Sequence, residues 1–252
     1  MIIYFTGTGN SLVVSRKLAE KLNEPMMSIY EAVEKDLSDA QRIGLVYPTY
    51  MMDAPLAVRE LVPRLRLPKD AYVFIVITCG AQTNNAVWAV RKLLRAQGIE
   101  IAYCNKIRFP DTAGLAYKRN PNDQLWKLER YAPRLDEIAA DIAAGKHALH
   151  YSGADPIGQL MSMPSVSAKF YGGFTPKVNA SKCVGCGICH KICPQGNIEM
   201  KDKQAVVGDH CTICLACVHF CGHQALELGG KPTQQSFQYH HPDINVKDLI
   251  KR

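Results

Sequence analysis

The sequence lacks any long apolar run. Its longest strongly apolar segment, residues 72–77, is far shorter than the roughly 20 residues that a membrane-spanning helix needs. The N-terminus also lacks a basic segment followed by an apolar core and a small-residue cleavage site, so we expect a cytoplasmic protein without a secretory signal. With 252 residues, 47% of them hydrophobic, the chain is long enough for one large domain or two smaller ones.

Two common nucleotide-binding motifs are also missing. A G-x-G-x-x-G fingerprint that begins at Gly7 would need a glycine at position 12, which is Leu12, and no Gly-Lys-Ser/Thr of a P-loop follows. No basic stripe interleaved with aromatic residues is present, although the formal net charge is +7. We therefore expect no nucleic-acid partner.

Cysteine, in contrast, is abundant and clustered. Of ten cysteines, Cys79 and Cys104 stand alone, and the other eight form two runs of the pattern C-x2-C-x2-C-x3-C. These runs are Cys183, Cys186, Cys189 and Cys193, and then Cys211, Cys214, Cys217 and Cys221. The second run repeats the first after 28 residues (211 minus 183). In a reducing compartment, such clusters indicate metal ligands or redox chemistry.

Iron–sulfur ligation gives this spacing a physical reason. Three thiolates at three-residue steps can surround three irons of one cubane, whereas the fourth, after its longer gap, reaches the other cluster. We expect one [4Fe-4S] cluster on Cys183, Cys186, Cys189 and Cys221, and another on Cys211, Cys214, Cys217 and Cys193. Zinc and disulfides are the alternatives, and zinc more often takes ligand pairs separated by a longer stretch. The nearby histidines are expected to be solvated or to donate hydrogen bonds to sulfur.

Residues 181–228 contain SKCVGCGICHKICPQGNIEM and DHCTICLACVHFCGHQALEL, and they resemble a bacterial two-cluster ferredoxin. The resemblance implies an α+β domain of two pseudo-symmetric halves, each a cysteine loop followed by a short strand. One position departs from the family pattern. Pro194 follows the last cysteine of the first run, but Gly222 stands where the second proline is expected, which leaves the chain after Cys221 looser.

The segment YFTGTGNSLVV at residues 4–14 contains a second candidate site. A strand over residues 2–5 is followed by a loop rich in hydroxyl and backbone N–H groups, and then by a helix that begins near Asn10 or Ser11. Exposed amides and the helix dipole favour a terminal phosphate monoester at such a loop. The alternative is a simple turn with a helix cap.

Alternating segments predict the fold of the first part. Strands are expected at residues 2–5, 26–29, 43–47, 72–77 and 101–107. Helices are expected after the first loop and at 30–37, 56–65 and 86–94, with a further helix that opens near Pro133. Five strands that alternate with helices predict a doubly wound parallel α/β sheet. In the flavodoxin-like order 2-1-3-4-5, the loops after strands 1, 3 and 4 converge on one crevice.

Residues 1 to about 145 resemble flavodoxin, and the resemblance implies FMN as the ligand. Carried over by position, its phosphate would be held by Thr6, Gly7, Thr8, Gly9, Asn10 and Ser11. The isoalloxazine would lie against Pro48, Thr49, Tyr50 and Met51 on one side and Thr78, Cys79 and Gly80 on the other. Tyr50 is expected to stack on the ring, and the nearby Tyr47 is the other candidate for this position. A loop aromatic that only packs against the protein is the alternative for Tyr50. Cys79 and Cys104 also have the simpler interpretation of buried core residues.

The predicted organisation begins with a flavodoxin-like FMN-binding domain over residues 1–146 and a connector over 147–180 with a short helix around 160–171. A 2[4Fe-4S] ferredoxin-type domain over 181–228 follows, and then a tail over 229–252 that is expected to pack back as a turn and a short helix. Clusters carry single electrons and FMN accepts one or two, so we expect an electron-transfer protein with a separate redox partner. The resemblance to fused flavodoxin–ferredoxin proteins implies an anaerobic source. An FMN-dependent reductase fed by the clusters, with Asp53 as the nearest carboxylate, and a redox-sensing module are the alternatives.

Overall fold

The computed structural model describes residues 1–114, 119–151, 156, 159–160, 163, 166, 173–229 and 231–250. The chain divides into two compact units. The first comprises Met1–Thr6, Asn10–Pro110 and Leu125–Ser162, and the second comprises Gly7–Gly9, Asp111–Gln124 and Met163–Arg252. The short segment Gly7–Gly9 therefore makes its contacts mainly with residues of the second unit.

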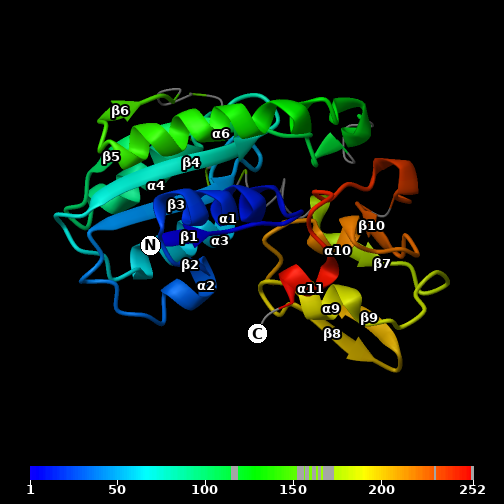
Figure 1. The fold of residues 1–252 in the computed structure, drawn as a ribbon. Helices are drawn as coiled ribbons and strands as arrows, with labels where there is room; N and C mark the ends of the chain where they lie inside the picture. Colours follow the sequence, from blue (N-terminus) through cyan, green and yellow to red (C-terminus); the bar gives the residue numbers. More distant parts are fainter. Residues whose placement is uncertain are drawn as a thin grey trace. The chain divides into compact units, whose positions relative to one another are not determined.

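The first unit is built on a parallel sheet (Figure 1). Its strands are β1 (Ile2–Tyr4), β2 (Met26–Ser28), β3 (Arg42–Pro48), β4 (Tyr72–Cys79), β5 (Ile101–Arg108) and β6 (Ala148–Leu149). They lie in the order β2-β1-β3-β4-β5-β6, and every pair is parallel. The central strands are almost continuously apolar because helices cover both faces of such a sheet. Gly44 is required in β3, since a Cβ there would lie 2.3 Å from Cζ of Phe74 on β4.

The helices of this unit follow the apolar periodicity of the sequence. They are α1 (Asn10–Leu22), α2 (Ile29–Ala32), α3 (Leu56–Leu61), α4 (Ala86–Arg95) and α6 (Lys127–Ala143). In α4 the side chains of Val87, Val90 and Leu94 are fully buried on one face. Lys92 and Arg95 occupy its last turn, where a positive charge interacts favourably with the negative end of the helix dipole.

The expected fold class is confirmed, with two corrections to its details. The sheet has six strands rather than five, because the two residues of β6, within the expected connector, pair with Tyr103 and Cys104 of β5. The helix expected to open near Pro133 begins at Lys127 and contains that proline. A single proline removes one intrahelical hydrogen bond, and the buried face formed by Tyr131, Leu135 and Ile138 compensates for that loss. The helix expected around 160–171 falls mostly outside the described residues.

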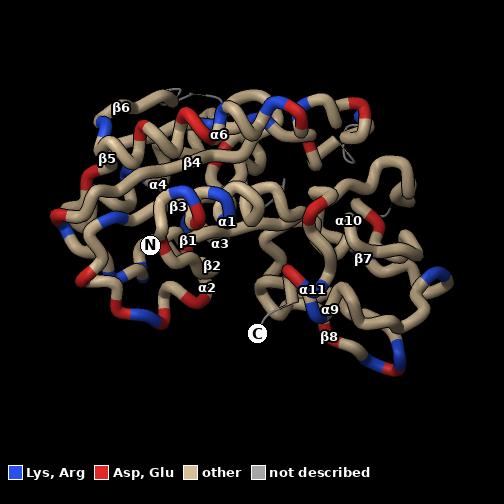
Figure 2. Tube along the Cα trace, viewed as in Figure 1, with Lys and Arg blue, Asp and Glu red and all other residues tan. Residues whose placement is uncertain are grey.

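The second unit contains two small antiparallel sheets. Strand β7 (Pro176–Val178) pairs with β10 (Leu226–Leu228), and β8 (Ile198–Lys201) pairs with β9 (Gln204–Val207). Two short helices, α9 (Ile188–Ile192) and α10 (Ala216–His219), each follow a cysteine loop. Their apolar core includes Ile198, Val218 and Leu226 together with the partly buried cysteines. Figure 2 shows basic and acidic residues interspersed along the traced chain in this view.

The backbone repeats after 28 residues, like the cysteines. Gly185 and Gly187 have positive φ angles of 70° and 73°, and their counterparts Ile213 and Leu215 have φ angles of 44° and 58°. The left-handed conformation costs little for glycine and roughly 1–2 kcal/mol for other residues. The second cysteine loop thus has the same left-handed backbone angles at these positions as the first. Those angles are strained in the second loop, because Ile213 and Leu215 carry a Cβ atom and glycine does not.

Candidate functional site

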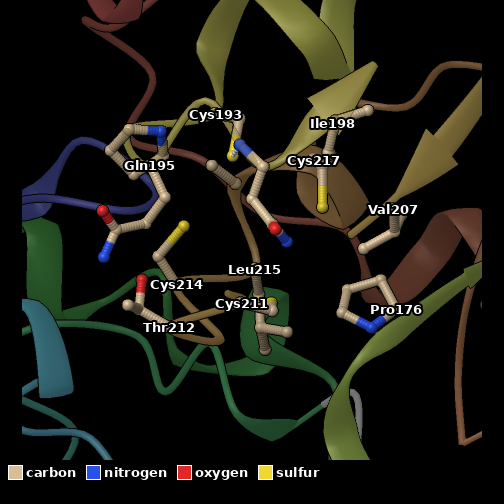
Figure 3. Close-up of a pocket in the computed structure, with 13 residues that line it drawn as sticks. Pro176, Cys193, Gln195, Ile198, Val207, Cys211, Thr212, Cys214, Leu215 and Cys217 are labelled. Atoms are coloured by element: carbon tan, nitrogen blue, oxygen red, sulfur yellow. Dashed lines mark hydrogen bonds between the residues drawn. The ribbon is translucent and has the colours of Figure 1, made fainter. Parts of the chain in front are cut away.

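The eight clustered cysteines line two separate cavities. One is lined by Cys183, Cys186, Cys189 and Cys221, and we name it cavity A. The other, cavity B, is lined by Cys193, Cys211, Cys214 and Cys217 and is drawn in Figure 3. Each cavity therefore combines three cysteines of one run with the fourth cysteine of the other run. This is the grouping that the sequence predicts for two cubane clusters.

Burial and neighbouring cysteines both raise the pKa of cavity-lining thiols. Burial raises the pKa of Cys189 to about 11, and nearby Cys221, Cys186 and Cys183 also raise it. Burial raises the pKa of Cys214 to about 12, with further contributions from Cys193 and Cys211. In the metal-free chain the thiols of Cys189 and Cys214 are therefore favoured over their thiolates, and iron binding must displace those two protons.

Backbone N–H groups point at cysteine sulfurs in a repeated pattern. The N–H of Asn197 donates to Sγ of Cys193 and the N–H of Ala225 donates to Sγ of Cys221, both at 3.3 Å. These two bonds are related by the 28-residue repeat. The bond to Cys221 forms even though Gly222 replaces the expected proline. Such donors stabilise negative charge on sulfur, which suits thiolate ligands of a cluster.

All ten cysteines are free. Within the described residues, no group of three or more His, Cys, Asp or Glu side chains converges closely enough to hold a single metal ion. A cubane spreads its four thiolates over four iron atoms, so its ligands do not need to converge on one point. The donor set of both cavities, four sulfurs with N–H donors beside them, fits such a cluster.

The two cavities differ in exposure. Cys186 of cavity A is exposed, as is its neighbour Val184, whose relative exposure is 60%. In cavity B, Cys217 is buried, and so is Thr212, with a relative exposure of 4%. A cluster in cavity A would therefore lie nearer to solvent than a cluster in cavity B.

The loop after β1 provides donors at the start of a long helix. Helix α1 begins at Asn10, and the side chains of Thr8, Asn10 and Ser11 are all buried. Ser11 Oγ lies 2.8 Å from Oγ1 of Thr78, a residue of β4. Within the described part of the chain, no hydrogen bond involves the backbone N–H of Gly7 or Thr8. Backbone amides at a helix N-terminus suit an anionic ligand, so this donor set fits a phosphate.

The loop after β3 is a tight turn. The N–H of Tyr50 donates to the carbonyl of Asp53 and the N–H of Asp53 donates to the carbonyl of Tyr50, both at 2.9 Å. Met51 and Met52, between them, have φ angles of 50° and 66°. The half-buried Tyr50 ring meets the ring of Phe5 edge to face at 6.1 Å. Tyr47, the other candidate for the stacking position, is a core residue with 2% exposure. Its hydroxyl donates to the carbonyl of Ala86.

Two hydroxyl groups in these loops lack a protein partner. Oγ1 of Thr49, after β3, and Oγ1 of Thr83, after β4, are buried and form no hydrogen bond within the described residues. Thr49 donates its backbone N–H to the carbonyl of Thr78 at 3.0 Å, which ties the start of the loop after β3 to the end of β4. A buried hydroxyl without a partner is costly unless a ligand or water satisfies it. The polar edge of a flavin ring is one group with the donors and acceptors to satisfy such hydroxyls.

The carboxylate of Asp53 is engaged by its own surroundings. Its Oδ1 accepts from the N–H of Ala54 at 2.8 Å and its Oδ2 accepts from Nη1 of Arg59 at 3.0 Å. Burial raises the pKa of Asp53, and the charge of Arg59 opposes that shift. These contacts indicate a structural role in the turn.

The two isolated cysteines lie in the sheet of the first unit. Cys79 and Cys104 are buried at 5% and 0% exposure. Burial raises the pKa of Cys104 to about 12, as is typical of an unreactive core thiol.

Sequence reasoning misses three features near the candidate sites. One is the buried hydroxyl of Thr83, and another is Lys127, a buried lysine whose Nζ donates to the carbonyls of Gly80 and Phe109. The third feature is the place where the C-terminal tail packs, because its contact with the loop at residues 7–9 is not predicted. The N–H of His241 donates to the carbonyl of Thr8 at 2.9 Å, and a Cβ on Gly9 would lie 2.7 Å from Cγ1 of Ile244. None of these residues has a local sequence signal, because each acts through a distant contact.

Known proteins are similar to parts of this chain. Residues 176–199 match the family model of the 4Fe-4S binding domain. A protein of Escherichia coli K12, UacF, whose name assigns it provisionally to the oxidoreductases, is 28% identical over 42% of this chain. One component of an ion-translocating oxidoreductase complex of Methanosarcina acetivorans is 43% identical over 18% of this chain. The matched parts span 17% and 18% of those two relatives.

Among solved structures, two-electron reduced flavodoxin of Megasphaera elsdenii is similar over 56% of this chain and 97% of its own, with 17% identity and a TM-score of 0.33. The sheet order, rather than this similarity, establishes the fold of the first unit. The sheet order and the family match together confirm the predicted resemblance and define the class of protein. That class is a flavodoxin-like α/β domain joined to a ferredoxin-type 4Fe-4S domain. None of the described helices is long and apolar enough to cross a membrane.

Proposed function

We propose that this chain is an electron-transfer flavo-iron–sulfur protein that exchanges electrons between FMN and two [4Fe-4S] clusters, and then with a partner redox protein. The observation that carries the proposal is the grouping of eight cysteines around two cavities in crossed sets of four. The family match to a 4Fe-4S binding domain supports iron–sulfur chemistry for residues 176–199.

Cavities A and B would each hold one cluster through their four thiolates. The N–H groups of Ala225 and Asn197 would donate to the sulfurs of Cys221 and Cys193, one in each cavity. Holding negative charge on sulfur in this way stabilises a cluster against loss and raises its reduction potential.

FMN would supply a centre that accepts one or two electrons. It could therefore exchange electron pairs with a hydride donor or acceptor and single electrons with the clusters. The phosphate would be held by Thr6, Gly7, Thr8, Gly9, Asn10 and Ser11, and the ring would lie against residues 48–51 and 78–80. The buried hydroxyls of Thr49 and Thr83, which have no partner within the described residues, support a polar ligand at these loops.

An FMN-dependent reductase would need an acid or base near the flavin. Asp53 is the carboxylate nearest in sequence, and both of its oxygens already accept hydrogen bonds from Arg59 and Ala54. The structure therefore gives the reductase proposal no specific support, and electron transfer remains the better proposal.

Anaerobic purification followed by iron, sulfide and acid-released flavin analysis tests the proposal. We expect about eight irons, eight sulfides and one FMN per chain. Stopped-flow reduction of the loaded protein should bleach flavin and cluster absorbance in linked phases. Zinc in place of iron in an oxygen-free sample, or an absence of flavin after reconstitution with FMN, would contradict it.

A further inference from the structure

Cavity B contains a buried hydroxyl that the protein does not satisfy. Thr212, between Cys211 and Cys214, lines the cavity and is 4% exposed. Its Oγ1 is buried and forms no hydrogen bond within the described residues. Figure 3 shows Thr212 beside Cys214, with its hydroxyl oxygen drawn on the side of that cysteine. A buried hydroxyl in a cavity otherwise lined largely by sulfur and apolar groups indicates that the bound group supplies the acceptor.

The internal repeat provides a comparison within the same chain. The position 28 residues before Thr212 is Val184, which follows the first cysteine of cavity A. Val184 has no hydroxyl and is 60% exposed. The two cavities therefore share their cysteine pattern, but only cavity B has a buried donor at this position.

We propose that the hydroxyl of Thr212 donates a hydrogen bond to a sulfur of the cluster in cavity B and thereby sets the reduction potential of that cluster above the value it would otherwise have. The inference rests on the proposed function, because it requires a cluster in cavity B. Reduction adds one electron and makes the cluster more negative. A donor bond to sulfur strengthens with that charge, so it stabilises the reduced form and raises the potential.

The low exposure of Thr212 strengthens the effect. Water competes poorly at a 4% exposed site, and an electrostatic interaction there is screened less than at the surface. A hydroxyl at position 184 would instead be hydrated. The same chemical change at the two repeat positions should therefore have different consequences.

The experiment compares Thr212→Val, Thr212→Ser and Val184→Thr with the wild type, all as full-length protein loaded anaerobically. Iron and sulfide are counted first, and the potential of each cluster is then measured by an EPR-monitored redox titration. A Cys186→Ala background, which removes a ligand of cavity A, identifies the signal that belongs to cavity B. Cluster potential is read out directly, so no partner protein is needed.

We expect Thr212→Val to lower the one-electron reduction constant of the cavity B cluster by roughly threefold to tenfold; a tenfold change corresponds to 59 mV. The cavity A signal should not move. Thr212→Ser should keep the wild-type potential because it retains the donor, and Val184→Thr should leave both potentials unchanged.

Unchanged potentials in a Thr212→Val protein that still holds about eight irons would overturn the inference. So would a Thr212→Ser protein that behaves like Thr212→Val, because a packing effect rather than the donor would then be responsible. A wild-type protein that holds no cluster in cavity B would instead overturn the proposed function. The iron count therefore separates the two failures.

Discussion

The crossed ligand sets can be tested with paired cysteine variants. Cys193 and Cys211 line the same cavity although they belong to different runs, whereas Cys183 and Cys193 belong to one run but line different cavities. Replacing the first pair by alanine leaves cavity B with two thiolates and cavity A with four. Replacing the second pair leaves three thiolates in each cavity.

The two pairs should therefore give different cluster contents. We expect Cys193→Ala with Cys211→Ala to retain one intact four-iron cluster, about four irons per chain, because cavity A keeps its full set. We expect Cys183→Ala with Cys193→Ala to retain no intact four-iron cluster, because three thiolates match only three irons. Anaerobic iron analysis with EPR of the oxidised and reduced protein distinguishes three-iron from four-iron clusters. Cys104→Ala, which changes a buried sheet cysteine, is the matched control and should keep about eight irons.

If each run held its own cluster, the outcome would be reversed. The pair from one run, Cys183 and Cys193, would then leave one intact four-iron cluster, and the pair Cys193 and Cys211 would leave none. That reversal would refute the grouping read from the two cavities. Loss of all iron in the Cys104→Ala control would show instead that alanine replacement prevents folding, and serine variants of the same pairs would then decide between the two groupings.

Three further predictions follow from burial and backbone geometry. A chelator applied to oxidised protein should remove the cavity A cluster first, because Cys186 is exposed; loss of the cavity B EPR signal first would contradict this. Arg59→Ala should lower the free energy of unfolding by about 3 kcal/mol at pH 8, because it leaves the carboxylate of Asp53 buried without its partner. Since burial raises the pKa of Asp53, that loss should shrink as pH falls and the carboxyl binds a proton, and urea denaturation at pH 8 and pH 5 measures the difference; an equal loss at both pH values would refute it. Gly222→Ala should raise the free energy of unfolding by about 0.4–1 kcal/mol, since φ is not in the left-handed region and nothing lies within 4 Å of the added Cβ; a lower denaturation midpoint would refute this.

Local patterns were sufficient to predict most of the first unit. The apolar runs of β3 and β4 and the four-residue spacing of α1 are properties of short segments, and the structure places these elements close to their expected bounds. Strand β6 could not be predicted in the same way. It has two residues and exists only because β5 offers an unpaired edge, which is a tertiary property. The predicted start of α6 was too late in the sequence, because a proline such as Pro133 ordinarily marks the first turn of a helix.

In the candidate sites, too, residues with a local sequence pattern were predicted and residues that depend on distant contacts were not. Cysteine spacing predicted which sulfurs share a cavity, because the geometry of a cubane is reflected in the spacing. The hydroxyl of Thr83, the ammonium of Lys127 and the contact of Ile244 with Gly9 had no such signal. Each depends on segments that are distant in the sequence. Position alone also left Tyr47 and Tyr50 unresolved, and the burial of Tyr47 in β3 separates them.

The 28-residue repeat shows what the second cysteine loop retains and what it changes. Ile213 and Leu215 adopt left-handed backbone angles that Gly185 and Gly187 adopt without strain. A strained backbone persists only where the surrounding structure fixes it, and here the shared requirement is the direction of three sulfurs into one cavity. The surroundings of those sulfurs differ in contrast, with the exposed Val184 at one site and the buried Thr212 at the other. Cluster potential depends on hydrogen bonds and solvent exposure around the sulfurs. If both cavities hold clusters as we propose, equal ligands in unequal surroundings would give them unequal potentials, and electrons would then have a preferred direction between them.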